Sequence, residues 1–240
     1  MDRKLAIVTG ASRGIGEAIA RKLTDDGFFV CMICRNSIDR ARKIACEIGG
    51  RAYQCDISDK TSVKTLIDEI YNEFSQIDLL VNNAGVSYSE LFHCAQNNDL
   101  QMLYGTNLFG TLNMTRAVLP MMINAKYGNI INIASIWGEV GASCEVDYSV
   151  TKSAIIGLTK ALSKEVGPCN IRVNCVSPGV IDTDMLSAFS SEDKDNLAND
   201  TPLSRLGKTC DVANAVSFLA SETAAFITGE VLSVGGGFAK

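Results

Sequence analysis

Short runs of apolar residues alternate with amphipathic stretches along most of this chain. The runs at 5–8 (LAIV) and 28–34 (FFVCMIC) have no polar alternation, which is typical of strands buried on both faces of a parallel sheet. Similar patterns predict further strands at 51–55, 77–81, 129–135, 171–176 and 231–234. Apolar residues at helical spacing predict helices at 15–23, 38–48, 63–74, 99–125, 148–166 and 212–219.

Strands and helices alternate throughout the chain, and this order favours a doubly wound, Rossmann-type α/β fold. We expect about seven parallel strands with helices on both faces of the sheet. No repeat, low-complexity tract or linker interrupts the pattern, so residues 1–240 are predicted to form a single domain. Residues 187–208 are polar, rich in Ser and Asp and only weakly periodic. We interpret them as a mobile lid with one or two short helices.

Composition and charge narrow the function classes. The 240 residues carry a formal charge of −5 and no long basic run, which argues against nucleic-acid binding. The apolar runs are too short to span a bilayer, and the N-terminus lacks the pattern of a secretory leader. A cytoplasmic location is therefore expected, with the nine cysteines as reduced thiols.

Neither the cysteines nor the single histidine predicts a metal site. Cys31 and Cys34 are three residues apart on a predicted strand, so their side chains would point to opposite faces and pack in the core. His93 has no Cys or Asp at ligand spacing, and we expect it on the surface.

A glycine-rich turn comes directly after the first predicted strand. Gly10, Gly14 and Gly16 have the spacing G-x-x-x-G-x-G and lie just before a helical pattern. Glycines let the backbone approach a pyrophosphate, and the N-terminus of the helix supplies free N–H groups. We therefore predict a phosphate cradle, with an ordinary tight strand–helix turn as the alternative.

The end of the second strand bears on the choice of dinucleotide. NAD-binding folds place a carboxylate there for the ribose 2′-hydroxyl, but this chain has Arg35. An arginine suits the 2′-phosphate of NADP(H), and Arg13 could join it. The alternative is a surface arginine paired with a nearby acid. Asp56 could bind the adenine amino group or begin the next helix, although Ser58 or Asp59 is a better N-cap.

The chemistry is predicted at the end of the fifth strand. Ser135 ends that strand, and Tyr148 and Lys152 lie four residues apart at the start of the next long helix, where their side chains share one face. A phenol beside an ammonium group can donate a proton to a carbonyl oxygen, and the cation should lower the pKa of the phenol. The Ser135 hydroxyl could hold the same oxygen. Taken alone, a Tyr-x-x-x-Lys pair more often marks a solvated helix face.

Two further stretches contain residues that are unusual for their predicted element. Asn82, Asn83, Ala84 and Gly85 come after the fourth strand, where open α/β sheets bind ligands; a plain turn is the alternative. Asn107 lies between two glycines inside a predicted helix, against its propensity, which points to a functional role.

These motifs together resemble the short-chain dehydrogenase/reductase family over essentially the whole chain. The resemblance implies that Tyr148 is the general acid, Lys152 lowers its pKa and binds the nicotinamide ribose, and Ser135 orients the carbonyl. Asn107 would anchor a water that links Lys152 to a proton relay. The implied cofactor contacts are Gly10, Ser12, Arg13 and Ile15 at the phosphates, with Gly14 and Gly16 in the same turn, Arg35 at the 2′-phosphate, Asp56 and Ile57 at the adenine, Asn83, Ala84 and Gly85 on the adenosine side, and Ile181 and Thr183 at the carboxamide.

Within that family the chain is most similar to 3-oxoacyl-[acyl-carrier-protein] reductases, through PGVIDTDM, PLSRLGK and the final FLASETAAFITGEVLSVGGG. This similarity implies NADPH-dependent reduction of a carrier-bound 3-oxoacyl thioester in fatty acid synthesis by a homotetramer. Reduction of a free small ketone, alcohol or sugar is the alternative within enzymes, and a non-catalytic NADP sensor is the alternative outside them. Trp137 is bulky for its place after Ser135, and Glu139, Glu145 and Asp147 put acids near the active-site loop.

Overall fold

The computed structural model describes residues 3–186 and 189–238. Its centre is a seven-stranded parallel sheet in the order β3-β2-β1-β4-β5-β6-β7, which confirms the predicted doubly wound fold. The strands are β1 (Leu5–Thr9), β2 (Phe29–Cys34), β3 (Arg51–Gln54), β4 (Leu79–Asn82), β5 (Gly128–Ile133), β6 (Ile171–Pro178) and β7 (Val231–Val234). Their ends lie within about two residues of the predicted ends, as hydrogen-bond assignments usually do.

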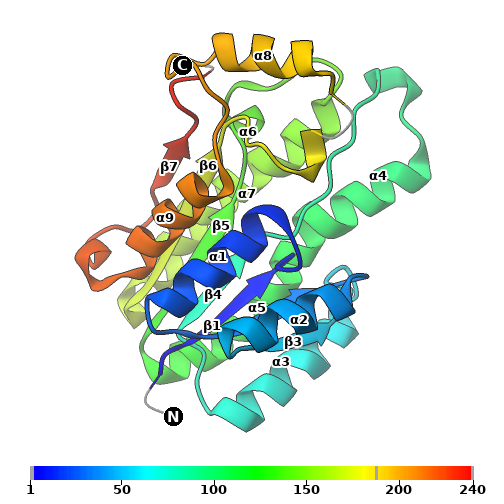
Figure 1. Cartoon of the computed structure of the whole chain (residues 1–240). Helices are drawn as coiled ribbons and strands as arrows, with labels where there is room; N and C mark the ends of the chain where they lie inside the picture. Colours follow the sequence, from blue (N-terminus) through cyan, green and yellow to red (C-terminus); the bar gives the residue numbers. More distant parts are fainter. Residues whose placement is uncertain (1–2, 187–188, 239–240) are drawn as a thin grey trace.

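Helices cover both faces of the sheet (Figure 1). One layer consists of α1 (Gly14–Asp25), α2 (Ile38–Ile48) and α9 (Thr209–Ala220). The other consists of α3 (Lys60–Phe74), α5 (Thr111–Ala125) and α7 (Val146–Val166). The central strands β1, β4 and β5 are buried along their whole length, because each is covered on both sides.

Three smaller expectations from the sequence are confirmed. Cys31 and Cys34 are both buried, with Cys31 in the core beneath α3 and α5. Asp59 is the N-cap of α3, because its carboxylate accepts a hydrogen bond from the Thr61 amide at 2.8 Å. His93 is exposed on a short turn of helix (Phe92–Cys94), as expected.

The predicted helical region over 99–125 is confirmed, since the chain is helical from Asn97 to Ala125, but it is not one regular α-helix. The structure has α4 (Asn97–Tyr104), a π-helical segment η2 (Gly105–Gly110) and then α5. Gly110 packs so closely on Ile57 that a Cβ there would lie 2.6 Å from the Ile57 side chain. The Thr111 hydroxyl also bonds to the carbonyl of Asn107 at 3.1 Å. A π-helical turn accommodates this irregularity, and such turns often lie at functional sites.

The carboxyl ends of the strands carry three further short elements, α6 (Trp137–Val140), η4 (Asp184–Leu186) and α8 (Ser191–Asn199). Figure 1 shows α6 and α8 at the same end of the sheet as the C-terminus. The helix α8 falls within the predicted lid, two of whose residues, 187 and 188, lie outside the described residues. The mobility of this segment stays a prediction.

Candidate active site

The glycine turn between β1 and α1 is joined directly to the end of β4. A Cβ on Gly16 would lie 2.2 Å from the carbonyl oxygen of Gly10, and one on Gly10 would lie 2.8 Å from the Cα of Ala84. Gly10 and Gly14 also have positive φ angles of 65° and 57°, which glycine adopts without strain. These contacts leave no room for side chains, so the predicted turn needs glycine for packing as well as for conformation.

Hydrogen bonds fix the same junction. The Thr9 hydroxyl oxygen accepts from the amides of Asn83 and Ala84, each at 3.0 Å. The Asn83 side-chain amide donates back to the carbonyls of Thr9 at 3.0 Å and Gly10 at 3.3 Å. Asn83 therefore shapes the predicted cradle through its side chain. Thr9 was not among the predicted site residues, although its position at a strand end, just before Gly10, could have indicated it.

The first turn of α1 fits a pyrophosphate. Its N-cap residue, Arg13, is extended and makes no side-chain capping bond, so the free amides of the first turn remain available for an anion. Ser12 is buried in the turn and Ile15 packs against the core from the first turn of α1. The predicted phosphate residues are thus brought together on one short segment.

Both arginines that were predicted to bind the cofactor are paired with carboxylates. Arg35 Nε lies 2.9 Å from Asp56 Oδ2, and Arg13 Nη1 lies 3.8 Å from Asp184 Oδ2. Arg35 therefore lies next to Asp56, which was predicted to bind the adenine. The structure also shows what the alternative interpretation of Arg35 expected, an arginine paired with a nearby acid. Asp184, in η4, was not predicted as a site residue.

Asp56 and Ile57 have separate tasks in the structure. The second carboxylate oxygen of Asp56, Oδ1, accepts from the amide and hydroxyl of Ser58 at 3.0 and 2.7 Å. Ile57 is buried against Gly110, and its carbonyl accepts from the Asn113 side chain at 3.0 Å. This places the π-helical segment directly behind the predicted adenine pocket.

Two predicted residues from distant elements, Gly85 and Asn107, meet beside Lys152, the lysine predicted to be catalytic. A Cβ on Gly85 would lie 3.4 Å from Asn107 Oδ1 and 3.5 Å from Lys152 Nζ. The Asn107 side chain pairs with the backbone of Val86 in both directions, at 2.8 and 2.9 Å. It also donates to the Thr151 hydroxyl at 3.3 Å. Asn107 thereby ties the loop after β4 to α7.

The faces of α7 explain which side chains reach the reaction centre. Val146 and Val150 are exposed and mark the outer face. Asp147 accepts a 2.8 Å bond from the Tyr104 hydroxyl, so that face of α7 meets α4. Tyr148 and Lys152 lie on a third face, which meets the end of β5.

Lys152 is buried between α7 and β5. It is 5% exposed, its Nζ donates to the Ile133 carbonyl at 2.9 Å, and it lies 5.6 Å from the centre of the Tyr148 ring. Burial lowers the pKa of Lys152 to about 8. Gly138 of α6 packs on this point, since a Cβ there would lie 2.7 Å from the Lys152 carbonyl carbon.

The expected lowering of the Tyr148 pKa is wrong for this structure. Burial raises the pKa of Tyr148 to about 12, although a hydrogen bond with Ser135 acts to lower it. The reason is that the ammonium group of Lys152 is directed to a backbone carbonyl, so desolvation outweighs its attraction for a phenolate. Ser135 itself is buried, and its hydroxyl oxygen accepts from the Trp137 amide at 3.2 Å.

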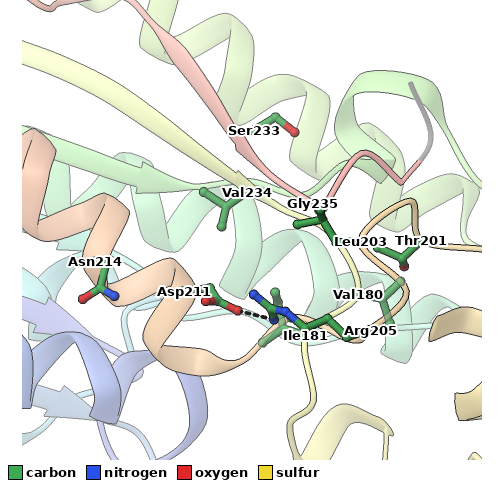
Figure 2. Close-up of a pocket in the computed structure, with 12 residues that line it drawn as sticks. Val180, Ile181, Thr201, Leu203, Arg205, Asp211, Asn214, Ser233, Val234 and Gly235 are labelled. Carbon is green, nitrogen blue, oxygen red and sulfur yellow. Dashed lines mark hydrogen bonds and ion pairs between the residues drawn. The ribbon is translucent and has the colours of Figure 1, made fainter.

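The segment after β6 crosses toward the glycine turn. Ile181 is buried and forms a bridge with Gly207, whereas Thr183 lies 3.8 Å from the position of a Cβ on Gly14. A cavity of about 370 Å³ borders this segment, between Ile181, α9 and the end of β7 (Figure 2). Figure 2 shows Arg205 and Asp211 pointing toward one another beside it, 2.7 Å apart. Ser135, Tyr148 and Lys152 do not line this cavity.

No helix of the described residues is long and apolar enough to cross a membrane. Within the same residues, no group of three or more His, Cys, Asp or Glu side chains could hold a metal ion.

Gly16→Ala should lower both stability and affinity for a dinucleotide. The new methyl group would meet backbone at Gly10, so the turn must move; we expect a loss of about 2 kcal/mol or more in the free energy of unfolding. The measurements are urea unfolding and NADPH binding by fluorescence. Gly167→Ala is the matched control, because nothing lies within 4 Å of its Cβ position. Equal behaviour of the two variants would contradict the packing argument.

Lys152→Met should abolish turnover yet stabilise the fold near neutral pH. The folded-state pKa of about 8 lies below the ordinary value of 10.5, so the unfolded chain binds the extra proton and stability rises with pH between those values. Below about pH 8 the buried cation costs roughly 3 kcal/mol. We expect the variant to gain roughly 1–3 kcal/mol at pH 7, less the lost bond to Ile133.

Urea unfolding of both proteins at pH 7 and pH 10, at equal protein concentration, measures this difference. The gain of Lys152→Met should shrink at the higher pH. A variant that is less stable than the parent at pH 7 would show that the burial cost was assigned wrongly.

Comparisons with known proteins agree with this geometry. The sequence family described as "Enoyl-(Acyl carrier protein) reductase" matches residues 10–239. Proteins named 3-oxoacyl-[acyl-carrier-protein] reductase FabG are similar over nearly the full length. The one from Aquifex aeolicus is 42% identical and covers 98% of this chain and 96% of its own. The one from Haemophilus influenzae is 39% identical, with coverage of 99% and 98%, and the one from Staphylococcus aureus is 38% identical, with coverage of 98% and 97%.

A solved structure titled "ElxO with NADP Bound" superposes with a TM-score of 0.92 at 34% identity and covers 98% of both chains. These matches span the glycine turn, the end of β4 and the Ser135, Tyr148 and Lys152 group alike. The chain therefore belongs to the short-chain dehydrogenase/reductase family.

Proposed function

We propose that this protein reduces the 3-oxo group of an acyl thioester on acyl carrier protein to the 3-hydroxy form, using NADPH, in fatty acid synthesis. The observation that carries the proposal is the convergence of Ser135, Tyr148 and Lys152 beside the glycine turn. The relatives named 3-oxoacyl-[acyl-carrier-protein] reductase, at about 40% identity over nearly the whole chain, support the substrate class.

The chain offers a continuous set of cofactor contacts along the carboxyl ends of its strands. The first turn of α1 would bind the phosphates, Arg35 the 2′-phosphate, and Asp56 with Ile57 the adenine. Asn83, Ala84 and Gly85 would line the adenosine side, and Ile181 and Thr183 the carboxamide. NADPH, when bound, supplies the hydride. The protein's part is to orient the two reactants and exclude water.

The side chains of the site divide the remaining chemistry between them. The Ser135 hydroxyl donates a hydrogen bond to the carbonyl oxygen, and Tyr148 transfers its proton to that oxygen. A raised pKa keeps the phenol protonated at neutral pH, as a proton donor requires. The Lys152 cation stabilises the phenolate left behind. Asn107 positions α7 against the loop after β4 and, with a bound water, would pass a proton to Lys152.

Reduction of a free small ketone or sugar, and a non-catalytic NADP sensor, are the competing functions. The intact set of Ser135, Tyr148 and Lys152 favours an enzyme over a sensor. The names of the full-length relatives favour a carrier-bound thioester over a free ketone.

A homotetramer in the cytoplasm is part of this proposal. Apolar side chains are exposed on adjoining elements, with Met102 on α4, Phe109 on η2, and Val146 and Val150 on α7, a pattern that favours contact with another copy. Near β7, Phe218 and Phe226 offer a second such surface. All nine cysteines are free, which suits a reducing compartment. We also propose that residues 1–240 act as one domain, with 187–208 closing over the substrate.

The purified protein should oxidise NADPH with acetoacetyl-[acyl-carrier-protein] and leave free sugars unreduced. Tyr148→Phe should lower the rate by at least about 100-fold, because a general acid contributes that much. NADPH binding, measured by fluorescence, should remain. The matched control is Tyr127→Phe, whose hydroxyl bonds to Lys4 away from the site. Turnover that survives in Tyr148→Phe would refute the assigned role, and selective turnover of a free ketone would favour the competing function.

Arg35→Ala should weaken NADPH far more than NADH. Loss of a charge-assisted bond to a phosphate is worth about 1.5–3 kcal/mol, so we expect KM for NADPH to rise by about 10- to 100-fold. KM for NADH should change by less than about threefold. The control is Arg42→Ala, since Arg42 is exposed on α2 and its one ion pair within the described residues is with Asp39. An equal rise for both dinucleotides would remove Arg35 from the 2′-phosphate.

A further inference from the structure

Glu145 lies immediately before α7, three residues ahead of Tyr148. It is the N-cap residue of this helix, yet its side chain makes no capping hydrogen bond. The next two side chains point in other directions. Val146 is exposed, and Asp147 accepts a hydrogen bond from the Tyr104 hydroxyl. Residues three and four apart share a helix face, so Glu145 lies on the face that carries Tyr148 and Lys152.

The carboxylate of Glu145 has no partner within the part of the chain that the structure describes. It forms no ion pair and no side-chain hydrogen bond there, and burial alone accounts for its pKa shift. The side chain is half-buried, and burial raises its pKa above the ordinary value. Its charge also raises the pKa of Tyr148. An unneutralised carboxylate thus lies within electrostatic reach of the phenol that meets the substrate.

A charge at Glu145 would affect substrates according to the group attached beyond the 3-oxo carbon. In a free 3-oxo acid, the carboxylate carbon is two bonds from the carbonyl carbon that is reduced. With the carbonyl oxygen at Tyr148, this second carboxylate would lie close to the first turn of α7, which Glu145 precedes. Two like charges about 6 Å apart in a partly buried site disfavour binding by about 10- to 100-fold. An ester or thioester in the same place carries no charge and avoids this repulsion.

We propose that Glu145 is a specificity-determining residue that directs the site to neutral 3-oxoacyl esters and thioesters and against free 3-oxo carboxylates. This inference rests on the proposed function, because it assumes a 3-oxo group at Tyr148. One consequence is that the protein binds and reduces acyl intermediates while they remain attached through a thioester, and discriminates against the free acids that hydrolysis releases.

The test compares ethyl acetoacetate and acetoacetate, which share the reacting carbonyl and differ in charge. We would measure kcat/KM for both with NADPH at about pH 7.5, where an ordinary carboxylic acid is ionised. The inhibition constant of acetoacetate against ethyl acetoacetate provides a binding readout that does not require acetoacetate to turn over. In Glu145→Gln, the ratio of acetoacetate to ethyl acetoacetate should rise by about 10- to 100-fold in both measurements, with little change for the ester.

Two further variants separate charge from structure. Glu145→Asp keeps the charge and should keep the discrimination. Glu139→Gln removes an exposed acid from α6 nearby and should leave the ratio unchanged, which excludes an effect of net charge. If Glu145→Gln discriminates as the parent does, or if Glu139→Gln changes the ratio equally, the inference is overturned. Failure of the parent with the carrier-bound thioester, while the charge effect persists with the ester pair, would count against the proposed function alone.

Discussion

The site depends on one close approach of backbone to backbone, between the glycine turn and the end of β4. Gly16 and Gly10 come so near that not even a methyl group fits between them, and the Thr9 hydroxyl holds two amides of the neighbouring segment. This junction aligns the free amides of α1 with Asn83, Ala84 and Gly85. Gly85 in turn lies against Asn107 and Lys152. The predicted phosphate site and the predicted reaction centre are thus joined by direct packing.

Burial of Lys152 and Tyr148 at the predicted reaction centre costs stability. The ammonium group of Lys152 is buried against the backbone carbonyl of Ile133, and its pKa falls accordingly. A phenol is buried beside it, and its pKa rises. Both shifts move these groups toward their neutral forms. The surrounding contacts, from Gly138 on one side and Asn107 through Thr151 on the other, hold α7 in place despite this cost.

The order of apolar runs was enough to predict the sheet and its two helical layers, because the central strands are buried on both faces and their pattern is simple. The glycine turn was also predictable, because the spacing of Gly10, Gly14 and Gly16 is visible in the sequence. The break at Gly105–Gly110 was not, since a π-helical turn depends on tertiary contacts with Ile57. The direction of the pKa shift of Tyr148 could not be predicted either. It depends on burial, which spacing along a helix does not reveal.

The two arginines predicted to bind the cofactor show how exposure determines the meaning of an ion pair. Arg13 and Arg35 both pair with carboxylates, and their side chains are 65% and 52% exposed. Pairs this exposed contribute at most about 1 kcal/mol each. A phosphate that accepts several charge-assisted bonds can therefore displace them. The carboxylates would then mainly orient the guanidinium groups, so the observed ion pairs are compatible with the proposed 2′-phosphate contact.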